Sequence, residues 1–283
     1  MFELLKAVLF GIVEGITEWL PISSTGHMIL LDEFIKLDVT PEFYSMFQVV
    51  IQLGAILAVV IIFWKDFFPF GRKNNRYPMK KHGPLSYVKK DKIYLWILIL
   101  LACIPAAVIG LLFDEYFEAL FYNYQTVSIA LIVFGIAFIV IETMNKDKKP
   151  RITNIYDLDL KTVLLIGVFQ LIAAIFPGTS RSGSTIVGAL LLGVSRTVAA
   201  EFTFYLAIPV MFGASLLKMI KFGLVFTYTE AAILGVGMLV AFLVSVVVIK
   251  FLMSYIKKND FKVFGYYRIV LGILVLVYFM FIH

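Results

Sequence analysis

Long stretches without a charged side chain limit this chain more than any other feature of its sequence. A helix needs about 20 apolar residues to cross a bilayer, and an isolated segment in lipid pairs its backbone groups only as a helix. Two further apolar stretches carry a single charge each, Glu201 in Thr197–Leu217 and Arg268 in Val263–His283. The others carry none: Phe43–Trp64, Ile93–Phe113, Ala119–Ile141 and Ala231–Ile249. The sequence therefore predicts six membrane-spanning helices.

Composition excludes the soluble classes of protein. Hydrophobic residues make up 61% of the 283 residues and charged residues 16%, whereas soluble domains average about 45–50% and about 25%. Cys103 is the only cysteine, so no intramolecular disulfide forms. The net charge of +6 comes from basic residues between the apolar stretches, which is typical of membrane-protein loops and not of a nucleic-acid-binding surface. We therefore expect an all-α integral membrane protein that binds no nucleic acid.

Two other apolar regions are interrupted by proline and polar residues. Met1–Leu31 is broken at Pro21, and Thr162–Val194 is broken at Pro177. Non-helical backbone at membrane depth is tolerated only where protein or water covers it. Each region is therefore predicted to form a re-entrant hairpin, in which two helices enter and leave the membrane on the same side.

The two hairpins belong to an internal repeat. Gly11-Ile12-Val13-Glu14 precedes the first proline break by the same offset as Gly167-Val168-Phe169-Gln170 precedes the second, and three spans follow each hairpin. We expect two halves, 1–148 and 149–283, that form one membrane domain. Because three spans are an odd number, the second half is inverted relative to the first. Inverted repeats bind their substrate at the repeat interface near the midplane.

The basic residues set the predicted orientation. Most Lys and Arg residues lie in the connections 65–92, 146–161 and 250–262, all on one side of the predicted topology. The short connection expected at 114–118, on the other side, has none. The positive-inside rule places the basic connections in the cytoplasm, so that both termini face outward. We expect the polar tips of the two hairpins to meet inside the membrane.

Two carboxylates share one face of the first hairpin helix, because Glu14 and Glu18 are four residues apart. A carboxylate at the bilayer centre costs roughly 2.5–3.5 kcal/mol, so two of them need a cation, a shared proton or water. They form a general-base or metal-ligand pair, or they lie near the interface and are solvated. The sequence leaves both interpretations open.

The segment Ser23-Ser24-Thr25-Gly26-His27 follows the first break. Such residues are ordinary at a helix start, but their hydroxyls and the free backbone N–H groups also suit an anion. His27 titrates near neutral pH. It is either a proton donor or nucleophile, or a packing residue.

Arg181 is the most informative residue of the second tip. A guanidinium remains charged and is costly at membrane depth, and it is the preferred bidentate ligand for phosphate. Arg181 therefore binds phosphate, or it forms a structural ion pair with one of the two glutamates. The two interpretations are compatible, because substrate phosphate could displace such a pair. The small and hydroxyl residues around it are Gly178, Ser180, Ser182, Ser184 and Thr185.

Both tips resemble the motifs of a known family. Glu14-x-x-x-Glu18 with the Ser-Ser-Thr-Gly-His tip resembles the first motif of the undecaprenyl-diphosphate phosphatase family, also called the bacitracin-resistance protein family. The run from Pro177 to Thr185 is similar to its second motif, P-G-x-S-R-S-x-x-T. The likeness covers nearly the whole chain, including Gln52-Leu53-Gly54 and Tyr267-Arg268-Ile269-Val270-Leu271-Gly272. The long basic connection at 65–92 departs from it.

The resemblance implies a bacterial plasma-membrane enzyme that removes the terminal phosphate of undecaprenyl diphosphate. The product is the carrier phosphate that cell-wall synthesis reuses. The family's site is thought to open to the outer face, and the family is described as needing a divalent cation.

The chemistry of the two tips fits this substrate. We expect Arg181 to hold the terminal phosphate, and Ser24 to attack it with Glu18 as base. Glu14 and Glu18 are the expected ligands of Mg²⁺ or Ca²⁺. His27 protonates the leaving phosphate or activates water, and whether Ser24 or His27 forms a covalent bond stays open. The expected phosphate ligands are Ser23, Thr25, Gly178, Ser180, Ser182 and Thr185.

Alternatives remain at this stage. Arg268 is predicted to contact a second phosphate or to anchor its helix at the interface. Inverted repeats with charges at the midplane are also found in transporters, so the alternative function is a transporter or flippase of a polyprenyl phosphate. Ser24 and His27 favour the enzyme, because transport needs no nucleophile. The expected partners are the polyprenyl diphosphate and membrane lipids, and a homodimer is a candidate assembly.

Overall fold

The computed structural model describes residues 2–71, 77–80, 83–223 and 225–281. Within these ranges the chain is mostly helical and forms isolated β-bridges but no strand, as the all-α prediction requires. Two 3₁₀ turns, η1 (Pro84–Tyr87) and η2 (Ile155–Asp157), lie between helices. The helices are α1 (Phe2–Thr17), α2 (Ser24–Phe34), α3 (Pro41–Val50), α4 (Gln52–Ile62), α5 (Trp64–Phe67), α6 (Lys90–Phe121), α7 (Tyr124–Met144), α8 (Leu160–Ile175), α9 (Arg181–Leu191), α10 (Arg196–Phe222), α11 (Tyr228–Tyr255) and α12 (Lys262–Phe281).

Six segments of the described chain are long and apolar enough to cross a membrane, which confirms the predicted multi-pass architecture. The first of them joins α3 and α4 at Ile51. His283, expected to end the last span, lies outside the described residues. The segments are Pro41–Ile62, Lys90–Gly110, Tyr124–Met144, Arg196–Phe222, Tyr228–Tyr255 and Lys262–Phe281.

The connection predicted at residues 114–118 is wrong, because α6 continues through it to Phe121. The sequence there contains neither Gly nor Pro, so nothing interrupts the helix. The connection instead lies at Tyr122 and Asn123. Asn123 caps α7, since its side-chain oxygen accepts a hydrogen bond from the Thr126 backbone N–H at 2.8 Å.

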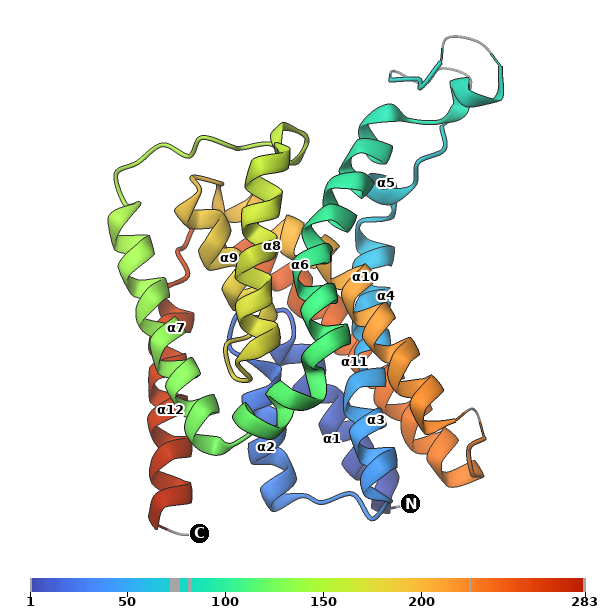
Figure 1. Ribbon diagram of the computed structural model, residues 1–283, viewed down its shortest axis with the longest axis vertical. Helices are drawn as coiled ribbons and strands as arrows, with labels where there is room; N and C mark the ends of the chain where they lie inside the picture. The colour runs from blue at the N-terminus through green and yellow to red at the C-terminus, as the bar shows by residue number, and fades with distance from the viewer. Residues whose placement is uncertain (1, 72–76, 81–82, 224, 282–283) are drawn as a thin grey trace.

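Both interrupted regions form helical hairpins, and the hairpins reach the interior from opposite ends of the molecule (Figure 1). α1 and α2 lie toward the end that carries both termini, whereas α8 and α9 extend inward from the other end. Each hairpin consists of a 16-residue helix followed by an 11-residue helix. The duplication of the complete halves 1–148 and 149–283 stays a prediction.

Helices far apart in the sequence pack in pairs. α1 packs along α11, α8 along α6, and α7 along α12. Small residues allow this close approach: a Cβ atom on Gly167 of α8 would lie 2.4 Å from the Ala102 carbonyl oxygen of α6. Each of the three pairs joins residues before 148 to residues after 149, so the chain has one shared interior.

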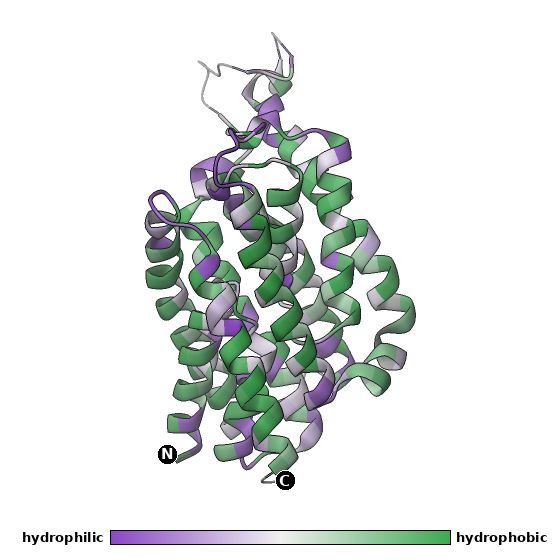
Figure 2. Ribbon diagram, turned by 90° about the vertical axis from the view of Figure 1, so that its left-hand side faces the viewer, coloured by the Kyte–Doolittle hydropathy of each residue, from purple (hydrophilic) through white to green (hydrophobic). Residues whose placement is uncertain are grey.

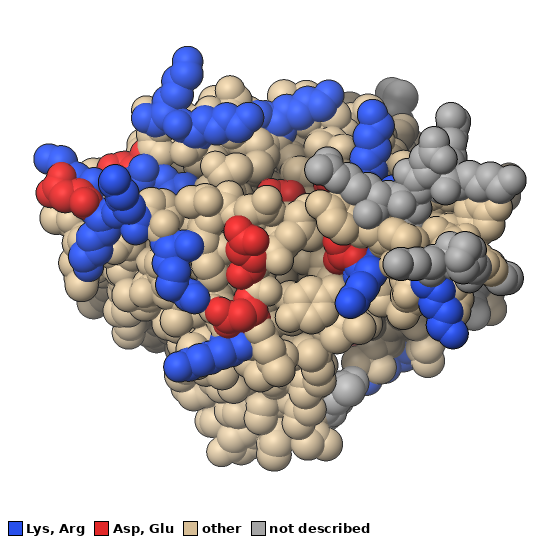
Figure 3. Space-filling view, turned by 90° about the horizontal axis from the view of Figure 1, so that it is seen from above, with Lys and Arg blue, Asp and Glu red and all other residues tan. Residues whose placement is uncertain are grey.

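The outer surface is apolar along the helices, as Figure 2 shows. On α7 the side chains of Ile129, Val133, Ile136 and Val140 are all exposed along one face, which lipid covers in an integral membrane protein. The basic connections lie at the end opposite to the termini (Figures 1 and 3). In the connection 65–92, residues 72–76 and 81–82 are outside the described residues.

Candidate active site

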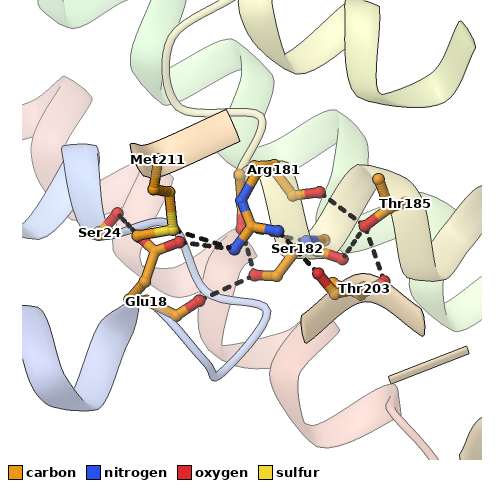
Figure 4. Close-up of polar contacts among 9 residues, drawn as sticks. Glu18, Ser24, Arg181, Ser182, Thr185, Thr203 and Met211 are labelled. Atoms are coloured by element: carbon orange, nitrogen blue, oxygen red, sulfur yellow. Dashed lines mark hydrogen bonds and ion pairs between the residues drawn. The ribbon is translucent and has the colours of Figure 1, made fainter. Parts of the chain in front are cut away.

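An ion pair joins the tips of the two hairpins. Arg181 Nη2 donates to Glu18 Oε1 at 2.8 Å, and the two side chains are only 14% and 7% exposed. Ser24 Oγ donates to the other carboxylate oxygen, Glu18 Oε2, at 2.9 Å (Figure 4). Three of the four residues predicted to be catalytic therefore form one hydrogen-bonded chain, in which the hydroxyl group is already bonded to its expected base.

An unusual backbone conformation directly precedes two of the predicted catalytic residues, Ser24 and Arg181. Ser23 (φ 75°) and Ser180 (φ 70°) are the two non-glycine residues with positive φ in the described part of the chain, and such conformations cost about 1–3 kcal/mol. Each serine Oγ accepts a hydrogen bond from the backbone N–H three residues further on, at 3.3 Å and 3.1 Å. The two short helices consequently begin at Ser24 and Arg181. A helix start of this kind favours an anion.

Two adjoining cavities lie beside the ion pair. The arginine cavity, of about 170 Å³, contains Arg181, and the lysine cavity, of about 160 Å³, contains Lys218. Their shared lining consists of Ser24, Thr25 and Gln52. The arginine cavity is also lined by Glu18, Ala173, Pro177, Gly178, Ser180, Val210, Met211 and Ala214. The lysine cavity is also lined by Glu14, Met28, Ser45, Gln48, Val49 and Tyr122.

The predicted phosphate ligands divide into two groups. Thr25, Gly178 and Ser180 line the arginine cavity, whereas Ser23, Ser182 and Thr185 are buried and line neither cavity.

The buried hydroxyls bond to the protein itself. Ser182 Oγ donates to the Glu18 carbonyl oxygen at 3.2 Å, and Thr185 Oγ1 donates to the Arg181 carbonyl oxygen at 2.9 Å. Arg181 Nη1 donates to the Thr203 carbonyl oxygen at 2.9 Å. These contacts hold the ion pair against α9 and α10 (Figure 4).

His27 lines neither cavity. Its Nδ1 lies 2.8 Å from the Ser23 carbonyl oxygen and its Nε2 lies 2.7 Å from the Tyr267 hydroxyl. A carbonyl oxygen only accepts, so Nδ1 carries a proton, and in the neutral ring Nε2 accepts a hydrogen bond from the Tyr267 hydroxyl. The structure thus does not bring His27 together with the other three residues, and both of its nitrogens are bonded.

Glu14 differs from Glu18 in having an oxygen atom without a partner. Its side chain is 1% exposed, and its Oε1 has no hydrogen-bond partner among the described residues. Gln48 and Gln52 add amide oxygens to the same cavity, and Mg²⁺ and Ca²⁺ prefer oxygen ligands. No cluster of three or more His, Cys, Asp or Glu side chains occurs in the ranges that the structure describes. The carboxylate of Glu14 and the amide oxygens of Gln48 and Gln52 are donors of the kind that fits an oxygen-coordinated cation.

Arg268 connects the two tips through their backbones. It is 0% exposed and donates to the carbonyl oxygens of Pro21 at 3.2 Å, Gly178 at 3.0 Å and Thr179 at 2.7 Å. No carboxylate pairs with it in the described part of the chain, and it lines neither cavity. This placement is not typical of either role considered from the sequence, because the side chain lines neither cavity and is fully buried.

Gly178 shows why the second tip needs glycine. Its φ is +89°, which side chains with a Cβ atom rarely adopt. A Cβ atom there would also lie 2.6 Å from the Val127 carbonyl oxygen of α7. The tip therefore rests directly on the α7 backbone.

Sequence reasoning missed the residues that the spans contribute to the site. Lys218 directly follows the stretch Thr197–Leu217, and the sequence interpretation used it only as the end of that span. Gln48 lies inside another span. Both were visible as polar groups at the edge of or within apolar stretches. Thr203 and Tyr267 also lie within apolar stretches, but their contacts to the tips were not predictable, because those contacts depend on how helices pack.

Comparison with known proteins identifies the family. The family model described as bacitracin resistance protein BacA matches residues 7–274. The chain belongs to this family. It is 64% identical to the undecaprenyl-diphosphatase of Desulfitobacterium hafniense over 99% of this chain and 97% of the relative. It is 63% identical to undecaprenyl-diphosphatase 1 of Clostridium acetobutylicum over 98% of each chain. It is 58% identical to an undecaprenyl-diphosphatase of Enterococcus faecalis over 97% of this chain and 96% of the relative.

Proposed function

We propose that this BacA family member is an undecaprenyl-diphosphatase. It hydrolyses undecaprenyl diphosphate to undecaprenyl phosphate and inorganic phosphate, which returns the lipid carrier to cell-wall synthesis and confers bacitracin resistance. The observation that carries the proposal is the chain Ser24–Glu18–Arg181 at a polar cavity within an apolar helix bundle. It combines a hydroxyl nucleophile, a base and a phosphate-binding cation.

In the first step of the proposed mechanism, the terminal phosphate enters the arginine cavity and takes the place of Glu18 at Arg181. Ser24 Oγ attacks its phosphorus while Glu18 accepts the hydroxyl proton. The bond to the bridging oxygen breaks, so undecaprenyl phosphate leaves and phosphoserine remains. Arg181 and the backbone N–H groups at the start of α9 stabilise the charge on the transferred group.

In the second step water hydrolyses the phosphoserine. Glu18 returns its proton to Ser24 Oγ, while water supplies one oxygen to the phosphate and loses one proton to the medium. The net reaction consumes one water molecule and yields inorganic phosphate. The same carboxylate therefore acts as base and then as acid.

Ser24 is the proposed nucleophile in preference to His27, because Ser24 lies in the lining of both cavities and is bonded to Glu18. His27 positions the tip, through its bond from Nδ1 to the Ser23 carbonyl oxygen. Trapping a phosphoenzyme and locating the label tests this assignment. A label on Ser24 supports it, and a label on His27 refutes it.

Glu14 is the proposed cation ligand, together with the amide oxygens of Gln48 and Gln52. Held by these oxygens, Mg²⁺ or Ca²⁺ would supply positive charge to neutralise the diphosphate oxygens. The unpartnered Oε1 of Glu14 supports this assignment. Glu18 is less suited, because both of its oxygens are bonded to Arg181 and Ser24.

The protein is proposed to lie in the bacterial plasma membrane with its basic connections in the cytoplasm. The site then opens to the outer face, because the lysine cavity includes Tyr122 and Lys218, which lie near the ends of α6 and α10. Figure 1 places these helix ends on the side of the termini. Labelling a cysteine placed at Thr25 from either side of sealed vesicles tests the opening, with Cys103 replaced by Ala.

Phosphate release from farnesyl diphosphate in detergent tests the function itself. The wild-type protein is expected to release phosphate, and Arg181→Ala and Glu18→Ala to lose this activity while they remain folded. Detergent removes the two compartments, so binding without hydrolysis would support the transporter alternative. Near wild-type turnover in either variant would remove that residue from the mechanism.

A further inference from the structure

The lysine cavity contains a cationic side chain, Lys218, that has no part in the proposed reaction so far. Lys218 is the one Lys or Arg among the described residues that line this cavity, as Arg181 is in the arginine cavity. Its Nζ donates to Ser45 Oγ at 3.2 Å, and no carboxylate pairs with it among the described residues. An ammonium group has three N–H donors, so Lys218 retains capacity for an anion.

The fold directs Lys218 into the lysine cavity and not toward lipid. One face of α10 lines both cavities. Met211 and Ala214 on this face line the arginine cavity, and Lys218 lines the lysine cavity. Phe212, Leu216 and Ile220, on another face of the same helix, are exposed by 44–63%.

The two cavities suit the two phosphate groups of a diphosphate. They adjoin through Ser24, Thr25 and Gln52, and the two phosphorus atoms of a diphosphate are separated by one bridging oxygen. Each cavity offers one cationic side chain. If the terminal phosphate occupies the arginine cavity, the phosphate attached to the lipid lies in the lysine cavity.

We propose that Lys218 binds the proximal phosphate of the prenyl diphosphate, which remains on the lipid after hydrolysis. This inference rests on the proposed function. Lys218 thereby holds the leaving group while the terminal phosphate is transferred, and it binds the lipid phosphate product until that product departs. The exposed apolar face of α10 beside it lets the prenyl chain remain in lipid.

Product inhibition separates the two subsites, because each product carries one of the two phosphates. In the purified full-length protein, Lys218→Gln is expected to raise the inhibition constant of farnesyl phosphate about tenfold or more, since charge-assisted hydrogen bonds to phosphate are strong. The inhibition constant of inorganic phosphate should stay unchanged. The KM for farnesyl diphosphate rises in parallel.

Three further variants serve as comparisons. Lys221→Gln removes the same charge one turn further along α10 and should behave as wild type. Lys218→Arg retains the cation and should recover most of the affinity for farnesyl phosphate. Ser45→Ala removes the hydrogen-bond partner of Lys218. It should raise the inhibition constant of farnesyl phosphate by a smaller factor than Lys218→Gln does. Melting temperatures in detergent establish that the variants are folded.

The proposal has clear contrary outcomes. Unchanged inhibition by farnesyl phosphate in folded Lys218→Gln would show that Lys218 does not bind the lipid phosphate. A rise in the inhibition constant of inorganic phosphate, alone or with that of farnesyl phosphate, would refute the separate subsites. Failure of the proposed function is distinguishable from both results, because the wild-type protein would then release no phosphate.

Discussion

Replacing Arg268 by methionine tests whether the two hairpin tips depend on one buried guanidinium. The change keeps an unbranched side chain of similar length and removes every donor. Arg268 is 0% exposed and donates to carbonyl oxygens of Pro21, Gly178 and Thr179 at 3.2 Å or less. The three carbonyls lie in both tips, so the variant should loosen the site from both sides.

The magnitude follows from these contacts. A hydrogen bond from a charged donor contributes about 1.5–3 kcal/mol, so three of them give about 5–9 kcal/mol before the cost of burial. Desolvation of the guanidinium offsets several kcal/mol. Removing the guanidinium also leaves three buried carbonyl oxygens without this donor, and an unsatisfied buried polar group costs about 1–3 kcal/mol. We expect Arg268→Met to melt at a clearly lower temperature in detergent and to lose phosphate release.

Two measurements distinguish this role from direct binding of phosphate. Thermal melting reports stability, and phosphate release from farnesyl diphosphate reports kcat and KM. A variant with wild-type melting and only a raised KM would show that Arg268 contacts substrate, which refutes the argument. Lys262→Met in the same helix is the control, because Lys262 Nζ lies 3.9 Å from Asp260 Oδ2 in a partly exposed pair worth about 0–1 kcal/mol.

Three further variants have defined outcomes. Glu18→Gln preserves a hydrogen bond to Arg181 but loses the base, so turnover should fall about 10²–10⁴-fold, and the melting temperature should also fall because Arg181 loses its counter-charge; a variant with wild-type turnover would exclude Glu18 as base. Gly178→Ala should lower both melting temperature and activity, because the new methyl group meets the α7 backbone; Gly110→Ala, where a Cβ atom meets nothing within 4 Å, should retain both. Tyr267→Phe should reduce kcat less than tenfold if His27 only positions the tip, and a loss like that of Glu18→Gln would place His27 in the chemistry.

The limits of prediction are visible in individual helices. The six spans were predictable because bilayer thickness sets their length and lipid excludes unpaired backbone groups. The end of α6 was predicted wrongly from the acidic residues near 114–118, since charge alone does not end a helix. The strained conformations of Ser23 and Ser180 were not predictable, because neither residue is glycine and tertiary contacts impose the positive φ.

By itself, the sequence determined that the chain lies in a membrane and is helical. It also determined the two proline breaks and the candidates Glu18, Ser24 and Arg181. These features depend on local composition, which the membrane constrains strongly. The tertiary structure alone decided that Arg181 meets Glu18 across 163 positions of sequence, and that Arg268 connects both tips. It also placed Lys218 in a cavity beside Ser24. Such contacts depend on which helix faces pack together, and that packing is set by small residues and shape over the whole bundle.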